Sequence, residues 1–455
     1  MKTKSIFTAA IITVIYLILF ITVYNLLSTP SIYNRFFSGF MPTYENLDGN
    51  VNVITTQKPF THITEKPFTE TMDAYHYATI KNNLYNYDPN DEVSRSNFAF
   101  FPLFPFVWRA LGVSGTGISI INFLLHCISI IILIHLFCRD NKILSLLVIF
   151  SLPTLVVFLI PYSEGLFMFS ISLALLGWKK ENRLLYIAGL LMASMTRPVF
   201  ILLIASCIAT EIYQRLCDKN YKINYKNIGI TTATILSGVL LVSLFQRTYH
   251  HGSLFTFISA QKHWGTYLQI PKTIVDWSNE GYAMNVWSLL FCFIFGGFIL
   301  ISKFLKKNKI EKSIPDYWYN FSWMYLLFAT LFVLMLQGGC LHSLYRYTLC
   351  TPFFYIIVLK HINKETIPQL TKPIVISVIF IIACLIFFTV ADYGKGWNFA
   401  KIGYVLLSLN LLFFIIMHRL RNTLKYIGYG TLMVTGIIWN CYLLNMFITK
   451  AWVFL

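Results

Sequence analysis

The sequence carries little charge for its length. Only 12% of its 455 residues are Asp, Glu, Lys or Arg, whereas a soluble globular chain carries about 25%. It also shows no long glycine-rich linker, no low-complexity block and no soluble domain. These absences exclude an ordinary water-soluble fold and a string of soluble domains.

Acidic residues are especially few. The chain has 19 Asp and Glu against 36 Lys and Arg, which gives a formal net charge of +17. A charge of that size could indicate a nucleic-acid partner. The basic residues, however, lie mainly in short loops between apolar runs, which is the positive-inside pattern of membrane proteins. We therefore predict membrane lipid, and no nucleic acid, as the partner of this charge.

Metal-binding patterns are absent as well. The nine cysteines include no C-x-x-C pair, and no His and Cys cluster has the spacing of a zinc site. Most cysteines lie inside apolar runs, where they pack as small hydrophobic residues. Cys340 and Cys350 lie near one predicted non-cytoplasmic loop, so a disulfide between them is an alternative to two packed thiols. We predict no cofactor, and a divalent metal ion stays an open alternative.

The sequence is rich instead in apolar runs of about the length that crosses a bilayer. These runs predict an all-α polytopic membrane protein with a single integral membrane domain, residues 1–455. The first run is too long for a signal-peptide core and no A-x-A cleavage site follows it, so we expect a retained helix. The runs lie at about 5–27, 117–137, 143–160, 164–178, 184–216, 228–245, 285–302, 320–337, 347–360, 373–391, 400–417 and 426–447.

The positions of the basic residues also favour one membrane topology over another. Residues 184–216 are too long for one ordinary span and contain the break Arg197-Pro198. If they form two segments, the chain has about 13 spans, and 22 of its 36 Lys and Arg lie in short cytoplasmic loops. A single span there would turn the Lys-rich loop at 303–312 outward. We expect the N-terminus and that loop in the cytoplasm, and the 246–284 loop on the far side.

The first far-side loop, residues 28–116, is long enough to have structure of its own, and we expect interfacial helices in it. A helix is predicted from about residue 71 to 84, because Asp73, His76, Tyr77 and Ile80 have the spacing of one helical face. The loop also contains a near-repeat with no assigned function, Lys58-Pro59-Phe60-Thr61 and Lys66-Pro67-Phe68-Thr69.

Five short motifs then occur in an order that resembles a known family. They are Asp73-Ala74-x-His76 with the aromatic run 97–105, Tyr162-Ser163-Glu164-Gly165-Leu166-Phe167, Arg197, Phe257-x-x-Ala260-Gln261-x-x-Trp264-Gly265, and Gly338-Gly339-Cys340-Leu341-His342 with Arg346-Tyr347. In this order they resemble the PIG-V-like mannosyltransferase family, which adds the second mannose to glycosylphosphatidylinositol, and its bacterial relatives. Met72 and Thr196-Arg197-Pro198 depart from the family pattern.

The resemblance implies a GT-C-type glycosyltransferase fold with its active site on the non-cytoplasmic face. It implies an inverting transfer, with mannose as the expected sugar, from a polyprenyl-phosphate or dolichyl-phosphate donor to a glycan or glycolipid acceptor. A carboxylate serves such a reaction as general base, and arginine suits the leaving phosphate. The residues that match are Asp73, His76 and Glu164 for catalysis, Arg197 and Arg346 for the donor phosphate, and Gln261, Trp264 and His342 for substrate.

Plainer readings of the same residues stay open. Asp73 could cap a helix or interact with its dipole, and Glu164 could interact with the dipole of the span that it opens. Arg197 could bind carbonyls freed by the Pro break, Arg346 could snorkel to head groups, and His76 could be a packed histidine.

Two other functions compete with the transferase. One is a lipid-linked glycan ligase or polymerase, and the other is a sugar-lipid transporter, which should show an internal repeat. The compact length and the Ala-Gln-x-x-Trp block favour a bacterial inner membrane, with the endoplasmic reticulum membrane as the alternative.

Overall fold

The computed structural model describes most of the chain. The described residues are 3–37, 59–85, 96–138, 141–249, 254–274, 282–305, 316–362, 399–417 and 420–449, together with Val378 and Ile382. Within them the fold is entirely helical, and no strand is present. The expected run at 373–391 and most of the 303–312 loop lie outside the described residues.

The long helices follow the apolar runs closely. They are α1 (Thr3–Ser28), α7 (Gly115–Phe137), α9 (Glu164–Lys179), α10 (Arg183–Thr196), α11 (Phe200–Cys217), α12 (Tyr225–Arg247), α14 (Tyr282–Leu290) with a π-helical turn and α15 (Gly297–Leu305), α16 (Tyr317–Leu336), α18 (Pro352–Ile362), α20 (Phe399–Ile416) and α21 (Asn422–Ile448). Shorter helices connect them: α2 (Pro30–Ile32), α3 (Pro67–Glu70), α4 (Met72–Asn83), α6 (Leu103–Leu111), α8 (Lys142–Phe150), α13 (Thr256–His263) and α17 (Leu344–Tyr347).

Within the described residues, seven helical segments are long and apolar enough to cross a membrane, and three more are apolar but shorter. A multi-pass membrane protein fits this set. Large aliphatic side chains stay exposed along these helices, for example Ile18, Ile120, Leu240 and Leu331, as expected where lipid replaces water. The predicted number of thirteen spans and the GT-C topology stay predictions.

The expected span at 143–160 does not form one helix. α8 stops at Phe150, and the chain continues through a turn into a short 3₁₀ segment, Leu155–Leu159. Pro153 explains the break, because proline clashes with a preceding helical turn and has no N–H to donate. The prediction of a continuous span here was wrong.

The predicted break at Arg197-Pro198 is confirmed. α10 ends at Thr196, Arg197 is extended with φ −146° and ψ 148°, and α11 begins at Phe200. The residue before a proline favours this extended conformation. The break therefore leaves the Arg197 side chain at the junction of two helices.

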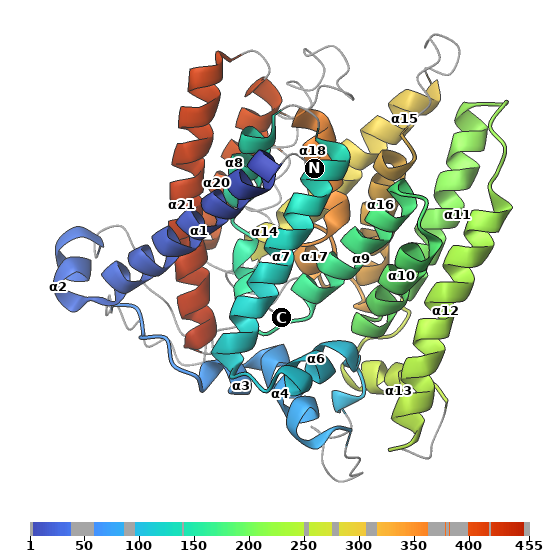
Figure 1. Ribbon diagram of the computed structural model, residues 1–455, viewed down its shortest axis with the longest axis horizontal. Coiled ribbons are helices and arrows are strands. Elements are labelled where there is room, and N and C mark those ends of the chain that lie inside the picture. The colour runs from blue at the N-terminus through green and yellow to red at the C-terminus, as the bar shows by residue number, and fades with distance from the viewer. Residues whose placement is uncertain are drawn as a thin grey trace.

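Helices α3, α4, α6 and α13 gather at the lower end of the bundle in Figure 1, whereas the α11–α12 connection lies at the opposite end. We call the lower end the rim and the opposite end the basic end. The predicted helix at 71–84 is confirmed as α4, and it belongs to the rim. The rim thus brings the first polar loop across the ends of the long helices.

The near-repeat anchors this loop. Phe60 packs between Tyr24 and Tyr442, with ring centroids 5.7 and 6.4 Å away, and Phe68 packs edge-on against Phe447 at 5.8 Å. Both phenylalanines are buried, so the segment that leads to α4 is fixed to α1 and α21. The repeat has a structural role, which is to hold the rim in place.

Candidate functional site

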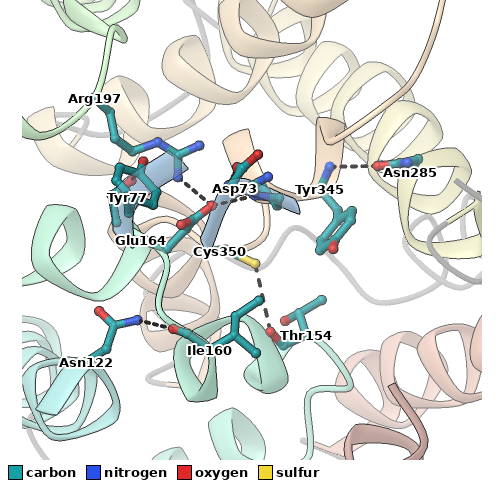
Figure 2. A network of polar contacts seen from close by, with 12 residues as sticks. Asp73, Tyr77, Asn122, Thr154, Ile160, Glu164, Arg197, Asn285, Tyr345 and Cys350 are labelled. Atoms are coloured by element: carbon teal, nitrogen blue, oxygen red, sulfur yellow. Dashed lines mark hydrogen bonds and ion pairs between the residues drawn. The ribbon is translucent and has the colours of Figure 1, made fainter. Parts of the chain in front are cut away.

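Four residues from distant parts of the chain meet in one ion-pair network at the rim. Arg346 Nη2 lies 2.8 Å from Asp73 Oδ2, and Arg346 Nε lies 2.5 Å from Glu164 Oε1. Arg197 Nη1 lies 3.0 Å from the same Glu164 oxygen. Figure 2 shows the Glu164 carboxylate pointing between the Arg197 guanidinium and the Asp73 side of the network. All four were predicted from the sequence as site residues.

The network is neutral overall but deeply placed. The side chains of Arg197 and Arg346 are each 6% exposed, Glu164 is fully buried, and Asp73 is 17% exposed. Burying ions is costly unless they pair and hydrogen-bond, so the two acids and two arginines stabilise one another only as a set. Asp73 is therefore the member that an incoming molecule reaches most easily.

A strained turn places Asp73. Met72 has φ +48°, a left-handed conformation that is unfavourable for a residue with a side chain. Thr71 occupies the N-cap position of α4 and makes no side-chain cap, and the Asp73 carboxylate is turned to Arg346. Asp73 thus sits in the first helical turn with a partner outside its own helix. Strain of this kind clusters at functional sites.

Close helix packing places Glu164. It opens α9, and the next residue, Gly165, lies against α7, where an added Cβ would come 2.1 Å from Asn122 Oδ1. Only glycine permits that approach. Asn122 Nδ2 in turn donates to the Ile160 carbonyl at 3.1 Å. The second carboxylate oxygen of Glu164, Oε2, is buried and has no hydrogen-bond partner among the described residues.

A glycine turn places Arg346. Gly338 and Gly339, directly after α16, have φ +60° and +98°, which glycine adopts without strain. Any Cβ at Gly339 would strike the Thr273 carbonyl at 1.9 Å. The Gly-Gly pair in the late motif is thus required by the backbone, and it turns the chain back towards Arg346 on α17.

Aromatic rings flank both arginines. The Arg346 guanidinium lies 4.5 Å from the Tyr162 ring centre, and that of Arg197 lies 4.8 Å from the ring of Tyr347. Cation–π contacts of this geometry hold a guanidinium in one plane. Both tyrosines belong to motifs that the sequence singled out, although the sequence assigned them no role.

His76 lies beside the network in an aromatic wall. Its ring stacks on Phe100 at 4.7 Å and meets the Trp264 ring edge-on at 5.2 Å. Nδ1 of His76 lies 2.8 Å from Oδ1 of Asn97, which accepts the hydrogen bond. Burial lowers the pKa of His76, against the opposing effects of Asn97 and of the Asp73 charge, so the ring is neutral at pH 7.

The three predicted substrate residues lie on two sides of the network. Gln261 Nε2 donates to the Ala99 carbonyl at 3.4 Å, and Trp264, which is 44% exposed, continues the wall around His76. His342 lies on the Arg346 side. Its Nδ1 is buried and has no hydrogen-bond partner in the part of the chain that the structure describes, and burial together with the Arg346 charge lowers its pKa to about 4.

Several neighbours of the site had no role assigned to them from the sequence. Tyr77 Oη donates to Ser163 Oγ at 2.8 Å and so ties α4 to the residue before Glu164. Asn285 Oδ1 accepts from the Tyr345 backbone N–H at 3.0 Å and so fixes the residue before Arg346. The sequence pattern could have indicated Tyr77, because it lies on the same helical face as Asp73. No pattern in the sequence indicates Asn285, which lies inside an apolar helix.

The described residues contain no cluster of three or more His, Cys, Asp and Glu side chains that could hold a metal ion. They also contain no disulfide between Cys340 and Cys350, both of which are buried. No family model, curated protein or solved structure matches the chain. The resemblance to the mannosyltransferases rests on the quoted motifs alone.

Proposed function

We propose that this protein is a membrane glycosyltransferase that moves a sugar, with mannose expected, from a polyprenyl-phosphate donor to a hydroxyl group of a glycan or glycolipid acceptor. The proposal rests on one observation above all. The network of Asp73, Arg346, Glu164 and Arg197 joins two arginines to a partly exposed carboxylate at one end of a membrane bundle. Such a set supplies both groups that the transfer needs.

The arginines are the proposed phosphate ligands. Arg346 already binds two carboxylates, and a phosphate presents oxygens of the same kind to a guanidinium. A donor phosphate at this place competes with Asp73 for Arg346. Binding of the donor thus releases the Asp73 carboxylate at the moment when a base is required.

Asp73 is the proposed general base. An acceptor hydroxyl oxygen attacks the anomeric carbon while the bond from that carbon to the phosphate oxygen breaks. The hydroxyl proton passes to Asp73, and the lipid phosphate leaves with the electron pair, held by the arginines. A single displacement of this kind inverts the anomeric configuration.

Glu164 is better suited to positioning than to proton transfer. It is fully buried, and one of its oxygens already holds both guanidinium groups. It keeps the two arginines close together in spite of their mutual repulsion. His76, neutral and stacked on Phe100, forms with Trp264 a wall on which a sugar ring can stack.

The experiment is a transfer assay with purified protein in lipid nanodiscs, supplied with radiolabelled polyprenyl-phosphate mannose and lipid extract from the source cells. Covalent label on an acceptor, together with a glycolipid that disappears from cells without the gene, supports the proposal. A sugar lipid that crosses vesicle membranes without covalent transfer would overturn it in favour of a transporter. Extension of a lipid-linked glycan by whole repeating units would instead identify a ligase or polymerase.

A further inference from the structure

A non-helical segment beside the site, residues 266–274, exposes several large apolar side chains. Leu268 is 71% exposed and Ile270 is 85% exposed, and Tyr267 is 49% exposed. We call this segment the outer strap. Two aliphatic side chains this bare within three residues are unusual on a surface that faces water.

Backbone contacts fix the outer strap against the end of α16. The N–H of Tyr267 donates to the Leu336 carbonyl at 3.0 Å, and the N–H of Gln269 donates to the Met335 carbonyl at 2.8 Å. These carbonyls belong to the last turn of α16, where backbone carbonyls have no N–H partner within the helix. The strap therefore satisfies a helix end, and Leu268 and Ile270 carry its most exposed large apolar side chains.

The apolar surface of the strap continues that of the spanning helices. Leu331 and Met335, one turn apart on α16, are 42% and 40% exposed, and Met335 bears the carbonyl that binds Gln269. α16 is one of the helices long and apolar enough to cross a membrane, so its outward face contacts lipid. The exposed residues of the strap extend this lipid-facing surface at the end of α16.

A second spanning helix leads to the same place. On α12, Leu240 and Leu244 are 45% and 47% exposed, and on α13, which follows it, Phe255 just before the helix and Ile258 within it are 43% and 47% exposed. Exposed apolar residues thus run from α12 over α13 to the strap. Lys272 adds an exposed cation there, as is typical at a head-group boundary.

We propose that the outer strap lies in the membrane interface, with Leu268 and Ile270 inserted at the boundary of head groups and acyl chains in the leaflet on the rim side. The strap also joins the two halves of the candidate site. Trp264, against His76, precedes it, and the Gly338-Gly339 turn that leads to Arg346 packs against it. Insertion of the strap thus holds the mouth of the site at the depth of the lipid head groups.

The test measures depth by fluorescence quenching. Leu268 and Ile270 are replaced one at a time by Cys and labelled with an environment-sensitive fluorophore, and the protein is reconstituted into phosphatidylcholine–phosphatidylglycerol vesicles that carry a nitroxide either near the head group or deep in the acyl chain. Leu240→Cys on α12 is the bilayer control, and Asn220→Cys, in the exposed turn between α11 and α12, is the water control. Wild-type protein treated with the same fluorophore gives the background signal from labelling of the native cysteines.

We expect blue-shifted labels at 268 and 270 that lose most of their emission with the shallow nitroxide and less with the deep one. Leu268→Glu should abolish the quenching of a label at 270 and leave that at 240 unchanged. Labels at 268 and 270 that behave like the one at 220 would overturn the proposal. Unquenched labels, together with disulfide cross-links between molecules of the unlabelled cysteine variants, would also overturn it and would make the strap a contact between two copies. Neither donor nor turnover enters this measurement, so its outcome is independent of the proposed reaction.

Discussion

Two buried glutamates at opposite ends of the bundle find their polar partners in different ways. Glu211, on α11 near the basic end, is 1% exposed and accepts hydrogen bonds from Tyr221 Oη at 2.9 Å and the Asn224 N–H at 3.0 Å. Glu164, at the rim, pairs with two arginines from distant segments and leaves one oxygen without a described partner. A loop close in the chain supplies the partners of Glu211, whereas the partners of Glu164 come from segments far apart in the sequence.

The ion pairs at the two ends differ in the same sense. At the basic end Lys360 pairs with Asp316, whose side chain is 33% exposed and whose carboxylate also caps α16 by accepting from the Trp318 N–H. That pair has a structural use in holding α16 and α18 together. The rim network instead joins four charged side chains from distant parts of the chain, and Asp73 pairs with Arg346 rather than capping its own helix. We interpret the Lys360–Asp316 pair at the basic end as structural and the rim network as functional. The variants described below distinguish the two roles.

Removal of Arg346 should have the largest effect. Arg346→Ala leaves Asp73 and Glu164 without a shared partner, and breaking a buried ion pair in this way costs about 3–5 kcal/mol. We expect transfer to fall below detection and thermal stability to drop. Lys360→Ala is the matched control at the basic end, and it should lower stability less and leave turnover per folded molecule unchanged. Equal losses of turnover in both variants would mean that the rim network is structural too.

Asp73→Asn should separate chemistry from stability. The change keeps size and hydrogen-bonding capacity but removes the base, so turnover should fall by about 10²–10⁴-fold, the usual contribution of a positioned base. The protein should stay monodisperse, because the side chain is partly exposed and does not cap α4. Asp316→Asn is the control and should show the reverse, with normal turnover and weakened packing of α16. Single-turnover rates and thermal melts of both variants check this.

The two glutamates give a smaller and directly paired comparison. Glu164→Gln removes the charge that holds Arg197 and Arg346 together, and charge-assisted hydrogen bonds of roughly 1.5–3 kcal/mol correspond to a loss of about 10–100-fold in turnover. Glu211→Gln places an amide beside the same two neutral donors, Tyr221 Oη and the Asn224 N–H. This variant should lower stability and leave turnover per folded molecule unchanged. The ratio of kcat/KM for the two variants, corrected for the folded fraction, decides the matter. A ratio near one would show that Glu164 does not position the arginines.

The smallest expected effect is on pH dependence. His342 has a pKa lowered to about 4 by burial and by the Arg346 charge, whereas an unfolded histidine titrates near 6.5. Because the unfolded chain takes up this proton more readily, His342 favours the folded state above about pH 6.5, and that contribution is lost as the pH falls towards about 4. His342→Gln should therefore flatten the decline of the melting temperature in this range. An unchanged decline would place His342 in contact with water.

Local signals in the sequence were enough for individual elements. The helix that carries Asp73 and the break at Arg197-Pro198 depend on residues close in the chain, and both were predicted correctly. Hydropathy failed at 143–160, where Pro153 interrupts an apolar run, because apolar composition alone does not separate a helix from a buried turn. The order of the motifs predicted which residues belong to the site but not how their side chains are arranged.

The partners of those residues depend on packing between distant helices, which no local pattern encodes. Nothing near Arg346 indicates that Asn285 fixes its neighbour Tyr345, and nothing near His76 indicates the hydrogen bond to Asn97. The shared oxygen of Glu164, bound by two arginines, was likewise beyond the sequence. The convergence of charges is thus a property of the three-dimensional structure.

We propose above all that a lipid phosphate takes the place of Asp73 on Arg346. The most direct measurement is the binding of polyprenyl phosphate to purified protein in nanodiscs, by calorimetry, for the wild type, Arg346→Lys, Asp73→Asn and the basic-end control Asp316→Asn. We predict that Arg346→Lys binds at least about tenfold more weakly, or roughly 1.4 kcal/mol, because lysine lacks the two-pronged geometry. Asp73→Asn should bind as tightly as the wild type or more tightly, since the competing carboxylate is gone, and Asp316→Asn should bind like the wild type. Wild-type affinity in Arg346→Lys, or weaker binding in Asp73→Asn, would contradict the account.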